Sequence, residues 1–270
     1  MTATLVRAGR WVTGHLVMFV ALLVLLYMFL PIMVVVLMSF DDTADVAYQF
    51  NGFTLANWSD PCSSYGMCDA VAKSLQIGLL ATVGATLLGT LMAFAMARHH
   101  FRGRSIANVG IFLPMASPEI VMGSSLLALF VSAGFAGQLG FATILIAHIM
   151  FCLSFVVVAV KARLSGMDNG LEQAAMDLYA NEWQTFWRVT FPLVFPGIVG
   201  AALLAFSLSF DDYIITNLVA GQSQTFPMYV WGVSRREIPP QINVIGTAML
   251  LVSILVVVMA EVVRRGRNRA

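Results

Sequence analysis

Long apolar stretches alternate with shorter polar stretches along this chain of 270 residues. A helix needs about 20 apolar residues to cross the hydrocarbon core of a membrane. Six stretches reach about that length, so we predict an all-α polytopic membrane protein with six transmembrane helices. The predicted spans are residues 16–38, 75–97, 106–135, 140–160, 197–219 and 242–263. Residues 1–15 precede them, and residues 16–270 form a single transmembrane domain in this prediction.

The first apolar stretch, residues 16–38, could also be a secretion signal. It is longer than the apolar part of a typical signal peptide, and no small-residue cleavage pattern follows it. We therefore expect it to be retained as a span.

A polar interval at residues 164–192 separates the fourth and fifth spans, yet its apolar residues recur at helical spacing. They are Leu171, Ala174, Ala175, Leu178 and then Trp183 or Phe186. Glu172, Asp177 and Glu182 occupy positions between them. This pattern predicts a short amphipathic helix outside the bilayer, and by itself it also fits a loop that rests on the lipid headgroups.

The composition excludes an ordinary soluble domain. Hydrophobic residues make up 59% of the chain and charged residues only 11%, whereas about a quarter of a soluble domain is charged. The three cysteines are too few and too scattered for a disulfide scaffold or a zinc site, and we predict no metal site.

The distribution of positive charge predicts the orientation. The amino terminus, the second and fourth connections and the carboxyl terminus hold 12 of the 15 Lys and Arg residues. Basic residues are enriched on the cytoplasmic side, so both termini and the interval at residues 164–192 are predicted to be cytoplasmic. The exceptions are Lys73, Arg235 and Arg236.

The first outer loop contains Cys62 and Cys68, separated by five residues. A disulfide between them would close a small loop if this side of the membrane is oxidising. Two free thiols are the alternative.

Three acidic residues lie inside apolar stretches: Glu119, which follows Pro114 and Pro118 in the third span, and the adjacent Asp211 and Asp212 in the fifth. A carboxylate in lipid is costly, so these side chains should face the bundle interior or a wet cavity. Alternatively, they cap broken helix ends or bond to neighbouring spans. Neighbouring residues on a helix point about 100° apart, so Asp211 and Asp212 can hardly both face one pathway.

The polar interval resembles the cytoplasmic "EAA loop" of ABC importer permeases, with the pattern E-A-A-x-x-x-G and, after it, I-x-L-P. The matching positions hold Gln173, Ala174, Ala175, Tyr179 and then Val189, Phe191 and Pro192. Gln173 replaces the family's Glu, which would then be supplied by the neighbouring Glu172. Tyr179 replaces the Gly, so a turn with positive φ at this position would be strained.

Further motifs resemble the second permease subunit of spermidine/putrescine importers. They are L-P-M-A-S-P-E-I-V-M-G from Leu113, A-A-M-D-L-Y-A-N-E from Ala174, S-F-D-D-Y from Ser209 and P-P-Q-I-N-V-I-G-T from Pro239. Permeases for iron, thiamine and sulfate share the same scaffold and are the alternatives within the family.

The resemblance implies a type I importer permease fold in the bacterial inner membrane, with no enzymatic activity and no cofactor on this chain. The implied partners are a homologous second permease, a dimeric cytoplasmic ATPase that binds ATP and Mg, an extracytoplasmic binding protein and membrane lipid, but no nucleic acid. The implied ATPase-coupling residues are Glu172, Gln173, Ala174, Ala175, Asp177, Leu178, Tyr179 and Ala180.

A polyamine carries several ammonium groups, which suits carboxylates spaced along a path. We expect Glu119 and one of Asp211 and Asp212 to line this path, and Tyr213 to offer a cation–π contact of about 0.5–2 kcal/mol.

Two other function classes remain possible. One is a stand-alone transporter or channel with an ion relay at Glu119, Asp211 and His148, and the other is an intramembrane enzyme built on His148, Cys152 and Asp211. Neither would need the EAA-like segment.

Overall fold

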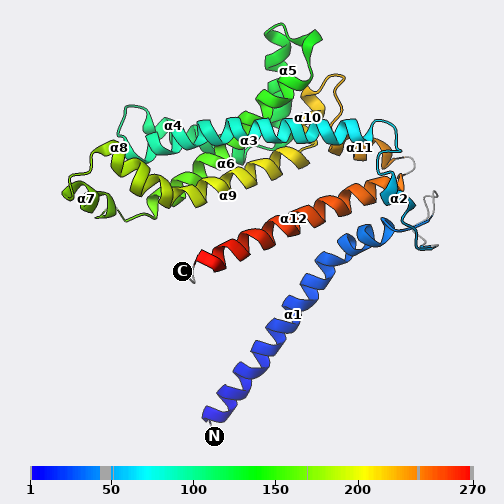
Figure 1. Ribbon diagram of the computed structural model, residues 1–270, viewed down its shortest axis with the longest axis horizontal. Coiled ribbons are helices and arrows are strands. Elements are labelled where there is room, and N and C mark those ends of the chain that lie inside the picture. Colours follow the sequence, from blue (N-terminus) through cyan, green and yellow to red (C-terminus); the bar gives the residue numbers. More distant parts are fainter. Residues whose placement is uncertain (1, 43–49, 51, 169, 236–237, 268–270) are drawn as a thin grey trace. The chain divides into compact units, whose positions relative to one another are not determined.

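The computed structural model describes residues 2–42, 50, 52–168, 170–235 and 238–267 (Figure 1). The described part consists of helices joined by turns and loops, with an isolated antiparallel bridge between Asp41 and Phe53. The chain divides into two compact units, Met1–Tyr65 with Val233–Ala270, and Gly66–Gly232. The single transmembrane domain expected at residues 16–270 stays a prediction.

The first unit pairs the two ends of the sequence. Helix α1 (Thr2–Met38) packs against α12 (Pro240–Arg267), which also contacts the short helix α2 (Ala56–Ser59). Beside α2, Phe40 stacks on Phe53 and on Trp58, with ring centroids 5.6 and 5.5 Å apart. The segment after α1 thus folds back as a small aromatic cap.

The second unit is built around three long helices that lie side by side, α3 (Met67–Arg98), α6 (Phe141–Ser165) and α9 (Phe191–Asp211) (Figure 1). Small residues let their backbones approach closely, the usual basis of helix association in membranes. A Cβ on Gly89 of α3 would lie only 2.7 Å from Cγ1 of Val156 on α6. Ala85, Ala147 and Ala205 contribute further small buried surfaces.

Within the described residues, five helical stretches are long and apolar enough to cross a membrane: His15–Met38, Met67–Arg98, Phe141–Ser165, Glu182–Asp211 and Pro240–Met259. The third predicted span, which Pro114 and Pro118 interrupt in the sequence, is a broken pair, α4 (Arg104–Ala116) and α5 (Glu119–Ser132), bent by 109°. The break falls at Ser117, whose ψ of 137° is the extended conformation favoured before a proline. Counted as one span, the pair brings the total to six.

The fifth span also differs from the prediction of residues 197–219. Its helical stretch begins at Glu182 and ends at Asp211, and residues 214–219 form a separate helix, α10 (Ile214–Val219). Two shorter elements lie elsewhere in the chain: the 3-10 helix η1 (Ala136–Gln138) follows α5, and α11 (Phe226–Val233) follows α10. The second break lies at Asp212 and Tyr213, inside the S-F-D-D-Y motif.

Candidate functional site

The predicted coupling segment forms a compact turn between α6 and α9. It contains α7 (Gly170–Asp177), α8 (Glu182–Thr185) and a π-helical turn η2 (Phe186–Thr190) that continues directly into α9. Figure 1 shows α7 and α8 at the end of the second unit where α3 ends and α9 begins. The amphipathic pattern therefore becomes a helix–turn–helix rather than one continuous helix.

Tyr179 makes the turn between α7 and α8 with a φ of +62°, the one positive φ among the described residues other than glycine. Its N–H donates to the carbonyl of Met176 (2.9 Å), and the N–H of Ala180 donates to the carbonyl of Ala175 (3.1 Å). The strain predicted from the Gly-to-Tyr replacement is thus present. After the turn, the side chain of Asn181 accepts the N–H of Gln184 (2.8 Å) and starts α8.

The structure divides the predicted coupling residues into two groups. Gln173, Ala174, Asp177, Leu178 and Tyr179 are exposed, whereas Glu172, Ala175 and Ala180 are half-buried. The exposed group includes large apolar side chains, since Leu178 is 82% and Tyr179 97% exposed. Exposed apolar groups on a polar segment are typical of an interaction surface.

Glu172 points into its own chain. Its Oε1 accepts hydrogen bonds from the guanidinium of Arg98 at the end of α3 and from the hydroxyl of Thr190 (2.6 Å). The Glu172 side chain is only 17% exposed. Its two partners lie 74 residues before it and 18 residues after it, so the sequence pattern gave no signal for either contact.

Asp212 is buried at the break between α9 and α10 in a network of polar side chains. Its Oδ2 accepts the hydroxyl and the N–H of Thr216 (2.7 and 2.8 Å) and lies 3.4 Å from Nε2 of His148. The same imidazole contacts the hydroxyl of Thr216 through Nε2 (2.8 Å) and that of Ser209 through Nδ1 (2.7 Å). The network joins α6, α9 and α10. Asp212 therefore bonds to neighbouring helices, which is the structural alternative considered for the acidic residues in the sequence analysis.

Asp211, in contrast, is exposed, and so is Glu119 at the start of α5. A Cβ on Gly123 of α5 would lie 3.3 Å from the Cα of Ile215 on α10, so these two helices touch there. Glu119 precedes Gly123 by four residues, about one turn of α5, and Asp211 precedes Ile215 by four residues across the break between α9 and α10. Tyr213 faces Trp231 with ring centroids 5.2 Å apart, which adds aromatic surface beside Asp211.

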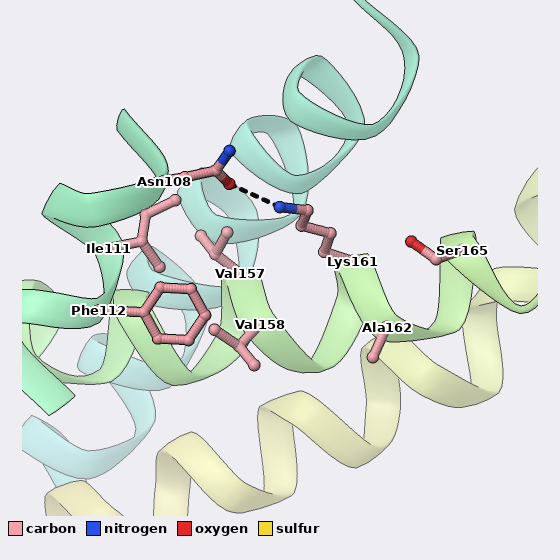
Figure 2. A pocket seen from close by; sticks show the side chains of 8 residues that line it. All are labelled: Asn108, Ile111, Phe112, Val157, Val158, Lys161, Ala162 and Ser165. Atoms are coloured by element: carbon pink, nitrogen blue, oxygen red, sulfur yellow. Dashed lines mark hydrogen bonds between the residues drawn. The ribbon is translucent and has the colours of Figure 1, made fainter. Parts of the chain in front are cut away.

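A pocket with a volume of about 220 Å³ lies between α4 and α6. Figure 2 shows that Nζ of Lys161 reaches toward the side-chain oxygen of Asn108, a distance of 2.6 Å. The other lining residues are Ile111, Phe112, Val157, Val158, Ala162 and Ser165. A pocket with a cation and no carboxylate does not suit a cationic substrate.

Cys62 and Cys68 are both disulfide-bonded in the structure, and Cys152 is free and buried. Among the described residues, no group of three or more His, Cys, Asp and Glu side chains could hold a metal ion. His148 and Cys152 both belong to the packed interior, where Cys152 Sγ donates to the carbonyl of Ala205 (3.4 Å).

Comparison with known proteins identifies the family of this chain. Residues 85–269 match the model of the family described as "Binding-protein-dependent transport system inner membrane component". The chain is 33% identical over 244 residues to the spermidine/putrescine transport system permease protein PotC of Escherichia coli (strain K12), covering 90% of this chain and 91% of PotC. It is 34% identical over 230 residues to the putrescine transport system permease protein PotI of the same organism, covering 83% and 82%.

The fold is also similar to solved structures. A chain of a bacterial ABC transporter involved in the import of the acidic polysaccharide alginate superposes with a TM-score of 0.65 at 17% identity, covering 94% of this chain and 96% of that one. At this identity the likeness concerns the fold alone. Together, the family match and the relatives show that the chain belongs to the binding-protein-dependent inner membrane components, the permease subunits of ABC importers.

Proposed function

We propose that this permease imports polyamines of the spermidine and putrescine class and forms half of the translocation pathway. The observation that carries the substrate assignment is the exposed carboxylate of Asp211 at the end of α9, next to the aromatic pair Tyr213 and Trp231. The relatives named as spermidine/putrescine and putrescine permeases support the same substrate class.

The chemistry of a polyamine fits these groups. Its ammonium groups are separated by short methylene chains, so it needs carboxylates at intervals and aromatic faces between them. Asp211 and Glu119 supply the charges, and Tyr213 supplies a cation–π surface worth about 0.5–2 kcal/mol. Asp212 is left out of the pathway because His148 and Thr216 already satisfy its carboxylate.

Coupling to ATP hydrolysis is assigned to the exposed group on the cytoplasmic segment: Gln173, Ala174, Asp177, Leu178 and Tyr179. We propose that this surface docks on a dimeric ABC ATPase that binds ATP and Mg, while a homologous second permease completes the pathway. A binding protein would deliver the substrate from outside, and both termini of this chain would lie in the cytoplasm.

Uptake of labelled spermidine and putrescine by cells expressing the complete transporter tests the substrate assignment. Asp211→Asn should lower uptake by roughly five- to hundredfold, the effect of removing one charged contact worth about 1–3 kcal/mol. ATPase co-purification should be unchanged. Gln222→Asn, which shortens an exposed side chain that carries no charge, serves as the control.

Two results would overturn parts of the proposal. Parental uptake of a neutral or anionic solute, with none of polyamines, would refute the substrate class and leave the family assignment intact. Uptake that continues after ATP depletion would refute the ATP-driven mechanism.

A further inference from the structure

Glu172, Arg98 and Thr190 form a three-residue contact that we call the coupling junction. Arg98 is the last residue of α3, Glu172 lies in the first turn of α7, and Thr190 is the last residue of η2 before α9. One carboxylate oxygen of Glu172 accepts from both partners. The junction therefore connects the surface helix α7 to two of the three long helices of its unit.

Apart from the junction, helix α7 contacts mainly α8 and η2, the two elements that follow it in the chain. None of its eight residues is buried, so the packing of an apolar face does not fix its direction. A helix of this length is also marginal by itself, because nucleation costs more than a few backbone hydrogen bonds return. The contacts of Glu172 thus fix the orientation of α7 relative to α3 and α9.

Further contacts join the helix ends around the junction. Phe94, one turn before Arg98, packs edge-on against Phe186 of η2 with ring centroids 5.5 Å apart. The guanidinium of Arg163 donates two hydrogen bonds, of 3.1 and 2.9 Å, to the carbonyl of Leu193 at the start of α9. Movement of α7 would therefore carry the ends of α3 and α9 with it.

The π-helical turn belongs to the same arrangement. The N–H of Phe191 donates to the carbonyl of Phe186, five residues earlier, which inserts an extra residue into the start of α9. Such insertions recur at functional positions in helices. Here the insertion immediately precedes α9, and its last residue is the Thr190 that binds Glu172.

We infer that Glu172 is a positioning residue: it transmits movement of α7 to α3 and α9 through Arg98 and Thr190, and it does not contact the ATPase. This inference rests on the proposed coupling function of the segment. It also separates Glu172 from Asp177, which lies on the same helix but is exposed and available to a partner.

The first test concerns the purified permease without ATPase. Hydrogen–deuterium exchange of residues 170–178 should rise at least fivefold in Glu172→Gln and in Thr190→Val. The exposed-acid control Asp177→Asn should match the parent. The double variant Arg98→Glu with Glu172→Arg should return exchange to within twofold of the parent, since it restores the ion pair. Unchanged exchange in Glu172→Gln would overturn the positioning role.

The second test uses the assembled transporter and compares uptake with ATP hydrolysis. Glu172→Gln should retain the parent's level of bound ATPase while transporting at least fivefold less substrate per ATP, and the charge-swapped double variant should recover most of that loss. Loss of ATPase binding in Glu172→Gln but not in Arg98→Gln would show a direct contact and overturn the inference. If the parent itself bound no ATPase, the proposed coupling function would fail, and the exchange result would still decide the role of Glu172 within the chain.

Discussion

Asp211 and Asp212 are neighbours in sequence with opposite surroundings. Asp212 lies within hydrogen-bonding distance of Thr216 and close to the imidazole of His148, whereas Asp211 is exposed. Asp212→Asn can keep a carbonyl oxygen for the two Thr216 donors at the Oδ2 position, but it then places an NH₂ group opposite the N–H of Ile215, which Oδ1 accepts. It also removes the negative charge beside His148. We expect the free energy of unfolding in detergent to fall by about 1–3 kcal/mol. Thermal unfolding of the purified protein measures this loss.

Asp211→Asn is the matched control for this prediction. It makes the same chemical change one residue earlier, on an exposed side chain, so the free energy of unfolding should stay within about 0.5 kcal/mol of the parent. An equal fall in the free energy of unfolding in both variants would contradict the structural role of Asp212.

The backbone at Tyr179 leads to a second prediction at this scale. Its φ of +62° is unfavourable for a residue with a Cβ, and its side chain is 97% exposed, so little packing is lost on truncation. Tyr179→Gly should stabilise the turn by about 1 kcal/mol, seen as slower hydrogen exchange at Ala180. Tyr179→Ala keeps the Cβ and should give no such gain. A gain of the same size in the alanine variant would rule out backbone strain as the cause.

Helix packing in the second unit depends on the absence of side chains at a few positions. A Cβ on Gly89 would meet Val156 Cγ1 at 2.7 Å and the carbonyl oxygen of Leu153 at 3.3 Å. Gly89→Ala should therefore lower the free energy of unfolding by about 1–3 kcal/mol, because α3 and α6 must separate. Gly110 on α4 has open space where its Cβ would be. Gly110→Ala should gain up to about 1 kcal/mol from helix propensity, so the two variants should shift thermal unfolding in opposite directions.

The elements also show how far the sequence could predict the fold. Lengths of apolar stretches located the long helices because a bilayer fixes the length of a span. The break at Pro118 followed from the restriction that a proline places on the residue before it. The break after Asp211 was missed, since no proline marks it and an apolar stretch continues through Ile214 and Ile215. It depends instead on the side chain of Asp212, which accepts the N–H of Thr216 in the first turn of α10.

The candidate site was predictable to the extent that its residues are neighbours in sequence. The motif located the segment that we propose couples to the ATPase, and its Gly-to-Tyr replacement located the strained turn at Tyr179. It could not separate Glu172 from the exposed coupling residues, because Arg98 lies 74 residues away. Likewise, His148 was considered as part of a relay, but its contacts with Ser209 and Thr216, 61 and 68 residues later, arise only when α6, α9 and α10 pack together.

At the scale of the whole molecule, the orientation in the membrane determines the redox state of the cysteines. Cys62 and Cys68 belong to the connection predicted on the outer side, where disulfides persist. Mass mapping of the protein taken from cells without reduction should therefore find the peptides of Cys62 and Cys68 linked and Cys152 free. Alkylation of all three thiols in intact cells would place this connection in a reducing compartment.

The orientation itself can be measured with two matched glutamines of the second unit. Gln173 lies on α7 and Gln222 follows α10, and both are exposed. The positive charges of the second and fourth connections predict that α7 is cytoplasmic and that residues 220–241 lie outside. A membrane-impermeant thiol reagent should therefore label Gln222→Cys in intact cells and label Gln173→Cys only after permeabilisation. The two parental glutamines carry no thiol, and buried Cys152 sets the background. The reverse labelling would show that the chain has the opposite orientation in the membrane. It would also contradict the proposed docking of the ATPase at α7, because a cytoplasmic partner cannot reach a segment on the outer side.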